Sequence, residues 1–189
     1  MSQHILDLPH VEHAEAEGEA KRVLDKAKAG VGFVPNMYKA MVNSPGLLET
    51  YLDGYARFRA SGVFTPAEQE VVFLTISDAN GCGYCMAAHT MLALHKSGVG
   101  AADVEALRAG KPLPTAKLEA LRAFTRHLWD TRARPTKEAV RAFHAAGYSD
   151  RHILELVLAC AVKTLSNWSN HLTEPAVDEV FAAHKVAAA

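Results

Sequence analysis

The chain has 189 residues and a formal net charge of -1, with 20 Lys and Arg against 21 Asp and Glu. Hydrophobic residues make up 49% and charged residues 22%, which is typical of a folded globular domain and excludes a disordered chain. The lack of a basic excess argues against nucleic-acid binding. The N-terminus lacks the features of a secretory signal, and no run of about 18 apolar residues predicts a transmembrane helix. We therefore expect a cytoplasmic protein that does not contact a membrane.

Helical periodicity runs through almost the whole chain, and no pair of strands with a hairpin turn is recognisable. We predict an all-α protein with a single domain spanning residues 1–189, although a linker with two prolines at 111–115 divides the helices into two groups. The predicted helices are residues 15–29, a turn or two at 37–43, 45–62, 66–79, 82–98, 102–109, 115–132, 137–147 and 150–172. Pro175 and an alanine-rich tail follow.

The clearest helix start lies at Thr65. Threonine is a good N-cap, Pro66 suits the first helical position, and Glu68 stands where a capping box needs an acid. This helix ends at Asn80-Gly81, a dipeptide that turns easily, and the next helix begins almost at once. So short a turn predicts an antiparallel hairpin in which Phe73 faces His89.

The chain has three cysteines, Cys82, Cys85 and Cys160, and an odd count argues against a disulfide scaffold. Cys82 and Cys85 form a C-x-x-C motif at a helix start, where the helix dipole and free N–H groups stabilise a thiolate. One thiolate can attack an oxidant and become a sulfenic acid, and the other can resolve it. Cys160 lies in an apolar run and is predicted to be a small buried residue.

His89 follows Cys85 by four residues, so the two share a helix face, and a histidine there can exchange a proton with a thiol near neutral pH. In the predicted hairpin Glu70 lies about one turn from the level of His89, where a carboxylate could orient the imidazole. Simpler interpretations remain open. Glu70 could be a solvated charge in the first turn, His89 a surface or core histidine, and Cys82, Cys85 and His89 the ligands of a metal.

Asn167, Trp168, Asn170 and His171 form a polar and aromatic cluster near the end of the last long helix. The cluster could line a pocket or a subunit contact, or it could serve packing and helix capping. Long amphipathic helices rich in Ala and Leu also predict a homo-oligomer. The sequence contains no Gly-rich phosphate loop, no G-x-S-x-G and no Rossmann fingerprint.

The spacing E-x11-C-x-x-C-x3-H, formed by Glu70, Cys82, Cys85 and His89, resembles the core of the alkylhydroperoxidase AhpD-like proteins. These belong to the carboxymuconolactone decarboxylase superfamily. The similarity is strongest over residues 65–99, and the chain length and the SNWSNHL segment resemble the peroxidase-related subgroup. The resemblance implies an all-helical AhpD-like fold, a homo-oligomer, and thiol-dependent reduction of hydroperoxides without metal, haem or flavin. It also implies that Cys85 attacks the peroxide, that Cys82 supplies a proton and resolves the sulfenic acid, and that Glu70 and His89 relay protons.

The characterised alkylhydroperoxidase has a histidine between its cysteines, whereas this chain has Tyr84, which hardly titrates near pH 7. The expected substrate is a hydroperoxide, with organic hydroperoxides among the candidates, and the expected electron donor is a dithiol protein of thioredoxin-like or lipoyl type. Two other classes of function compete with this one. A decarboxylase-like lyase would use Glu70 and His89 as acid and base without the cysteines. A redox-sensing or metal-binding helical module would have no catalytic activity.

Overall fold

The computed structural model describes residues 5–186, and all regular structure within that range is helical, which confirms the predicted all-α class. The elements are α1 (Gly18–Val31), α2 (Asn36–Met41), α3 (Pro45–Ala60), α4 (Pro66–Ala79), α5 (Gly83–His95), α6 (Ala101–Arg108), α7 (Ala116–Asp130), α8 (Lys137–Ala145), α9 (Asp150–Thr173) and the 3-10 helix η1 (Glu179–His184). No helix in this part of the chain is both long and apolar enough to span a bilayer.

The predicted helix boundaries hold best where the capping chemistry is explicit. The Thr65 hydroxyl accepts the N–H of Glu68 at 3.2 Å, and the Glu68 carboxylate accepts the N–H of Thr65 at 2.9 Å, so the capping box forms. The first helix is displaced from its predicted range of 15–29 to Gly18–Val31. It continues past Gly30 because Gly32, at φ 90°, takes the left-handed conformation that ends the helix.

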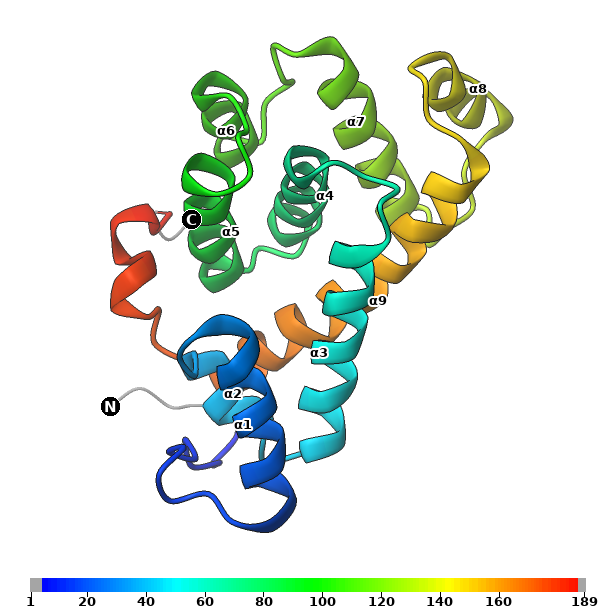
Figure 1. Ribbon diagram of the computed structural model, residues 1–189. Helices are drawn as coiled ribbons and strands as arrows, with labels where there is room; N and C mark the ends of the chain where they lie inside the picture. Colours follow the sequence, from blue (N-terminus) through cyan, green and yellow to red (C-terminus); the bar gives the residue numbers. More distant parts are fainter. Residues whose placement is uncertain (1–4, 187–189) are drawn as a thin grey trace.

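The centre of the fold is α4, which lies between α5 and α7 and packs against α9 as well (Figure 1). Ten consecutive residues of α4, from Glu68 to Ser77, are buried. A helix enclosed on every side carries no polar face, and this explains the apolar run VVFLTI. The two glutamates that are nevertheless buried in its first turns need partners from other helices.

Two helix pairs bring the functional side chains together. The short turn after α4 folds α5 back beside it, as the sequence predicts. On another side α3 crosses α9 at Gly54, where a Cβ atom would lie 2.9 Å from Cγ2 of Val162. Only glycine permits so close a crossing, and it lets α3 and α9 both reach the α4–α5 hairpin.

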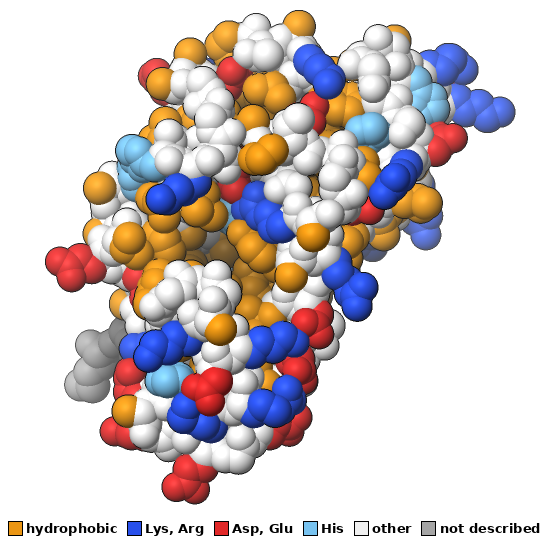
Figure 2. Space-filling model, in the orientation of Figure 1, with side chains coloured by type: hydrophobic (Ala, Val, Ile, Leu, Met, Phe, Trp, Pro, Cys, Tyr) orange, Lys and Arg blue, Asp and Glu red, His pale blue; other side chains and the backbone are white. Residues whose placement is uncertain are grey.

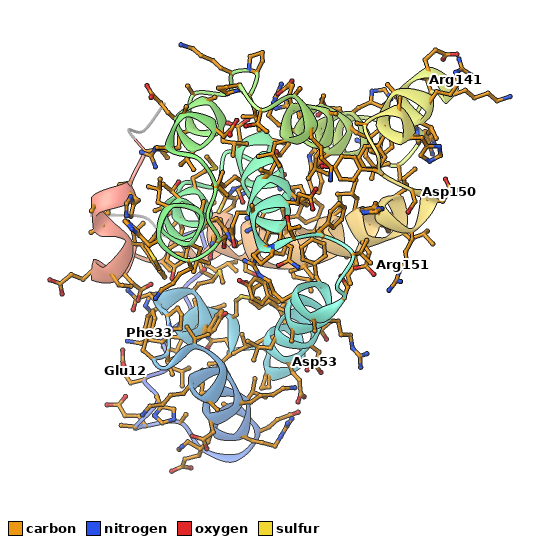
Figure 3. All side chains as sticks on the ribbon, turned by 45° about the horizontal axis from the view of Figure 1, so that its top comes forward. Glu12, Phe33, Asp53, Arg141, Asp150 and Arg151 are labelled. Atoms are coloured by element: carbon orange, nitrogen blue, oxygen red, sulfur yellow. The ribbon has the colours of Figure 1, made fainter. Side chains whose placement is uncertain are left out.

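The remaining elements enclose this centre. In Figure 1, α1 and α2 lie together at one end of the molecule, and η1 lies along α5. The sequence after Pro175 predicts no helix, and the structure shows the 3-10 helix η1 in this segment. Charged side chains lie at the periphery, as Figure 3 shows for Glu12, Asp53, Arg141, Asp150 and Arg151.

Candidate active site

The C-x-x-C motif opens α5, with Cys82 as the N-cap and Cys85 in the first turn. Both side chains are buried, and both are free thiols. The side-chain amide of Asn170, on α9, donates to Sγ of Cys82 at 3.5 Å and to Sγ of Cys85 at 3.4 Å. The two sulfurs therefore converge on one amide donor.

The two thiols differ in acidity. A hydrogen bond from Cys82 lowers the pKa of Cys85 well below its usual range; burial opposes this, and the positive charge of Lys163 lowers it further. The same hydrogen bond, together with burial, raises the pKa of Cys82. Cys85 is therefore the more acidic of the two thiols, and Cys82 is the one that holds its proton more tightly.

The predicted contact between the two helices of the hairpin is confirmed. Nδ1 of His89 lies 2.8 Å from Oε2 of Glu70, and the ring centroids of His89 and Phe73 are 4.9 Å apart. Glu70 is 1% exposed and His89 is 5% exposed. The interpretations of Glu70 as a solvated charge and of His89 as a surface residue are therefore wrong.

The protonation of this pair follows from its surroundings. Burial raises the pKa of Glu70, but His89 and Arg59 outweigh burial, and the net pKa is lowered. An ionised carboxylate can only accept, so Nδ1 of His89 carries the hydrogen of their bond. Burial and the charge of Lys163 lower the pKa of His89. The imidazole is thus neutral at pH 7, and Nε2 is left as a proton acceptor.

Arg59, at the end of α3, is a site residue that the sequence did not indicate. Its Nη2 donates to Oε1 of Glu70 and, at 2.8 Å, to the Tyr55 hydroxyl. The guanidinium carbon lies 4.9 Å from the ring centroids of both Tyr55 and Phe73. An arginine in a last helical turn ordinarily complements the helix dipole, so its position in the sequence gives no sign of this role.

Lys163 is a second residue that the sequence analysis missed. It lies on α9 with 1% of its surface exposed, and its Nζ is 5.5 Å from the ring centroid of Phe73. A signal for it exists in the sequence, because Lys163 is the one charged residue in the apolar run LVLACAVKTL. A lysine on a face that must be buried against other helices needs a special environment.

Tyr84, between the cysteines, contacts the C-terminal segment and has no bond to the histidine relay. Its hydroxyl donates to Asp178, the N-cap of η1, and accepts the N–H of Met37 at 3.5 Å. Burial and Asp178 both raise the pKa of the phenol, so Tyr84 does not titrate near neutral pH. Its side chain ties α2 and η1 to the start of α5.

Tyr84→Phe is expected to loosen η1, because it removes a hydrogen bond to a charged acceptor that contributes about 1.5–3 kcal/mol. Amide hydrogen exchange over residues 179–184 measures this local opening, and exchange should become faster there. Tyr148→Phe is the matched control, since Tyr148 also donates to a buried glutamate, Glu68, at 3.0 Å. Unchanged protection of η1 in Tyr84→Phe would contradict the proposed anchoring.

A cavity of about 440 Å³ reaches the thiolate. Figure 2 shows hydrophobic side chains lining a hollow in the middle of the drawn face. Cys85 and His89 are in its wall, and among the described residues that line it Lys96 is the one lysine or arginine. The rest of the wall is mainly apolar and aromatic: Phe33, Tyr38, Tyr51, Tyr55, Met91 and Phe181.

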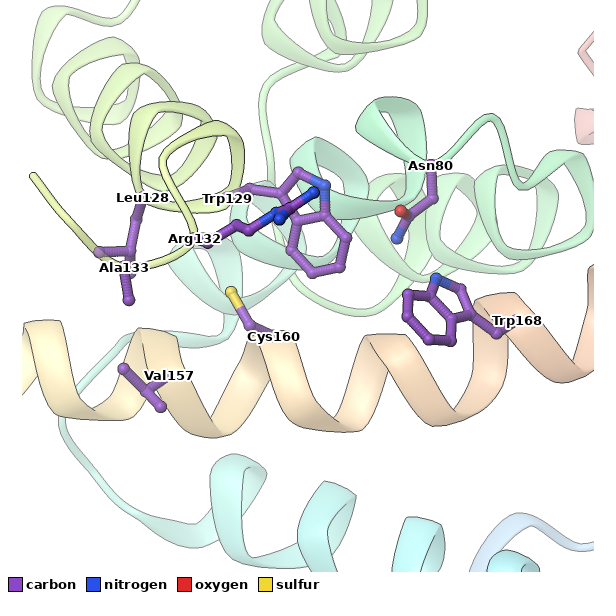
Figure 4. Close-up of a pocket in the computed structure, with 8 residues that line it drawn as sticks. All are labelled: Asn80, Leu128, Trp129, Arg132, Ala133, Val157, Cys160 and Trp168. Carbon is purple, nitrogen blue, oxygen red and sulfur yellow. The ribbon is translucent and has the colours of Figure 1, made fainter.

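A second cavity of about 480 Å³ lies between α7 and α9 (Figure 4). Cys160 lines it and is only partly buried, so the prediction of a buried small residue is wrong. Burial raises the pKa of its thiol to about 12. Among the described residues that line this cavity there is no second thiol and no acid–base pair, so the first cavity is the better candidate for the active site.

The cluster near the end of α9 separates into two faces. Asn167 and Asn170 point inward. The side-chain oxygen Oδ1 of Asn167 accepts a hydrogen bond from the side-chain amide of Asn80 at 2.8 Å, and the side-chain amide of Asn170 donates to the thiols. Trp168 is 57% exposed beside the second cavity, and His171 is exposed.

Within residues 5–186, no group of three or more His, Cys, Asp and Glu side chains is arranged to hold a metal ion.

These features define a helical protein with a buried thiol pair and an acid–base pair beside it. Residues 45–126 match the model of the carboxymuconolactone decarboxylase family. The curated proteins give no match. A peroxidase-related protein from Ralstonia eutropha, described as an alkylhydroperoxidase AhpD core, has 18% identity and a TM-score of 0.78 over 92% of this chain and 93% of its own.

Two other solved structures are similar. A peroxidase-related protein from Silicibacter sp. has 20% identity and a TM-score of 0.75 over 96% of this chain and 95% of its own. The debrominase Bmp8 in complex with 2,3,4-tribromopyrrole has 17% identity and a TM-score of 0.74 over 95% of each chain. The chain therefore has the AhpD-like fold, and the segment that matches the model of the carboxymuconolactone decarboxylase family, 45–126, contains Glu70, Cys82, Cys85 and His89.

Proposed function

We propose that this chain is a thiol-dependent peroxidase that reduces apolar or aromatic hydroperoxides with the Cys82–Cys85 pair. The observation that carries the proposal is the buried thiol pair that converges on the Asn170 amide, with the more acidic thiol, Cys85, in the wall of an apolar cavity. Perturbed acidities of this kind are typical of catalytic sites.

The chemistry balances with these two cysteines, the hydroperoxide and one proton from the solvent. The Cys85 thiolate attacks the terminal oxygen of ROOH, the O–O bond breaks, and Cys85 becomes a sulfenic acid. The leaving alkoxide takes the proton of Cys82 and departs as ROH. The Cys82 thiolate then attacks the sulfenic sulfur, forming the disulfide, and the released hydroxide takes a proton to become water.

The relay has a defined part in this scheme. When the disulfide is reduced again, Nε2 of neutral His89 accepts the proton of the Cys85 thiol and passes it to the solvent. In the same way it passes a solvent proton to the hydroxide that leaves the sulfenic acid. Glu70 fixes the tautomer through Nδ1, and Arg59 keeps Glu70 ionised. Glu70 and Arg59 therefore act through His89.

A dithiol protein is the proposed electron donor, because a disulfide formed in a small cavity is returned to thiols by exchange with another dithiol. Homo-oligomerisation also stays a prediction. In its favour, α9 exposes apolar side chains that are spaced along the helix: Leu154, Val157, Trp168 and Leu172. Exposed apolar stripes of this kind mark association surfaces.

Removal of bromine from an aromatic ring is a second candidate. The aromatic wall of the cavity suits a flat ring, and the similar debrominase binds 2,3,4-tribromopyrrole. Replacing bromine with hydrogen takes two electrons, which a dithiol supplies as it becomes a disulfide. The lyase function, suggested by the family name, would instead use only Glu70 and His89.

Titration of the reduced protein separates these candidates. One equivalent of an aromatic hydroperoxide, or of a bromopyrrole, is added, and intact mass and free thiols are measured. A peroxidase loses two thiols and about two mass units with the hydroperoxide. A debrominase does so with the bromopyrrole and releases bromide. If all three thiols survive both reagents, the thiol proposal fails, and lyase activity in the Cys82→Ser/Cys85→Ser variant becomes the question.

A further inference from the structure

The buried polar cluster around Phe73 contains two cations and one carboxylate. Glu70 uses Oε1 for Arg59 and Oε2 for His89, so both of its oxygens have partners. Lys163 is fully buried, and its ammonium has no hydrogen-bond partner of good geometry among residues 5–186. The charges of Arg59 and Glu70 cancel each other, so no carboxylate of the cluster balances the charge of Lys163.

A buried ammonium without a counter-charge is strongly unfavourable. The contact of Nζ with the face of Phe73, at 5.5 Å, offsets only a small part of this penalty. Another anion in the same cluster is therefore required. Among the remaining described acids of the cluster, Cys85 is the one whose pKa is lowered.

We infer that Lys163 is the counter-ion of the Cys85 thiolate and acts as a positioning residue that keeps this sulfur ionised in the reduced protein. The inference deepens the proposed thiol chemistry and rests on it for its function. It assigns to α9 two parts of the site, since Asn170 donates to the same sulfur two helical turns after Lys163. The polar inner face of α9 is thereby explained.

The charges around Cys85 agree with this assignment. Lys163 lowers the pKa of Cys85 through its positive charge. The charge of Lys163 also lowers the pKa of His89. The other titratable groups of the cluster come from every helix packed against α9: Tyr38 of α2; Tyr51, Tyr55 and Arg59 of α3; Glu70 of α4; and Cys82, Tyr84 and His89 of α5.

Oxidation then changes the charge balance. When Cys85 passes from thiolate to disulfide, its negative charge is lost and Lys163 has no counter-ion. The reduced form is therefore favoured over the disulfide by the presence of Lys163. A disulfide whose reduced form is stabilised in this way is a stronger oxidant.

The test is the pH dependence of Cys85 alkylation in the reduced chain, measured with iodoacetamide and site-resolved mass spectrometry. Lys163→Met keeps the length and apolar volume of the side chain without its charge. We expect the pH midpoint of alkylation to rise by about 1–3 units, the effect of removing an opposite charge next to a titrating group. Lys163→Arg should keep the midpoint of alkylation close to the wild-type value, because it keeps the positive charge.

Lys96→Met is the matched control, since Lys96 is an exposed lysine at the same cavity. Its midpoint should stay at the wild-type value. A folded Lys163→Met variant with an unchanged midpoint overturns the inference, and so does a Lys163→Arg variant that shifts as far as Lys163→Met. If Lys163→Met does not fold, Lys163→Gln gives the same readout with a neutral polar side chain.

Equilibration with a glutathione redox buffer gives an independent measurement. Lys163→Met should move the equilibrium between dithiol and disulfide toward the disulfide by about tenfold or more, whereas a purely structural role would leave it in place. Neither assay contains a peroxide. The inference can therefore fail while the peroxidase proposal stands, and it can pass if the chain reduces a different oxidant.

Discussion

Cys85→Ser is expected to lower the rate of hydroperoxide reduction by about 10³-fold or more, because a hydroxyl has no ionised form at neutral pH with which to attack the peroxide. The other thiol does not replace it, since burial still raises the pKa of Cys82 in this variant. The measurement is the initial rate of consumption of an aromatic hydroperoxide with excess small-molecule dithiol.

The other two cysteines provide the controls for this result. Cys160→Ser should keep the wild-type rate, because Cys160 lies in the separate cavity between α7 and α9. Cys82→Ser should stop at the first step and accumulate a sulfenic acid on Cys85, detectable by a dimedone-type reagent. Full activity in Cys85→Ser, or a sulfenic acid on Cys82 in its place, would reverse the assigned roles.

Glu70→Gln is expected to have the largest effect on stability and a large effect on rate. It leaves Arg59 facing a neutral amide in a buried site, and breaking a buried ion pair costs about 3–5 kcal/mol. It also frees the tautomer of His89, so we expect a fall in rate of about 10²-fold or more. Urea unfolding and initial rates measure the two effects.

The pH dependence of this destabilisation gives a further check on its cause. The fold lowers the pKa of Glu70, so its contribution to stability is complete above the ordinary carboxyl pKa of about 4.3 and is lost as the pH falls through the folded value. The difference between wild type and Glu70→Gln should therefore be largest near neutral pH and shrink in acid. A difference that is constant with pH would point to packing.

Glu68→Gln is the matched control on the same helix. Glu68 is also a buried glutamate, but its partners are the Thr65 cap, Tyr148 and Lys117, away from the thiols. The substitution should lower stability by about 1–2 kcal/mol and leave the rate unchanged. If both variants lose the same activity, the rate effect of Glu70→Gln reports general loosening and not the relay.

The part of the site that lies on one hairpin could be predicted from the sequence. The cap at Thr65 fixes where α4 begins, and the short turn at Asn80 fixes how α5 returns. Helical periodicity then places Glu70 and His89 on facing sides of the two helices, within about one turn of each other. Each step uses residues that are close in the chain, so local rules are sufficient.

The part that comes from other helices could not be predicted. Arg59, Lys163 and Asn170 reach the hairpin only because of the way α3 and α9 cross it. Helix crossing depends on the shape of two packed surfaces, and no local pattern encodes it. Asp178 is a similar case, since its bond to Tyr84 joins residues that are far apart in the chain.

The close crossing at Gly54 also affects the electrostatic potential at the two cysteine sulfurs. Arg59 stands five residues after Gly54 on α3, and Lys163 follows Val162, the residue that Gly54 contacts, on α9. The separation of these two helices therefore sets how near two fixed positive charges come to the sulfur pair. In a medium of low dielectric constant, the potential of each charge is large at every distance. The missing side chain at Gly54 thus helps to determine the electrostatic potential in which Cys85 works.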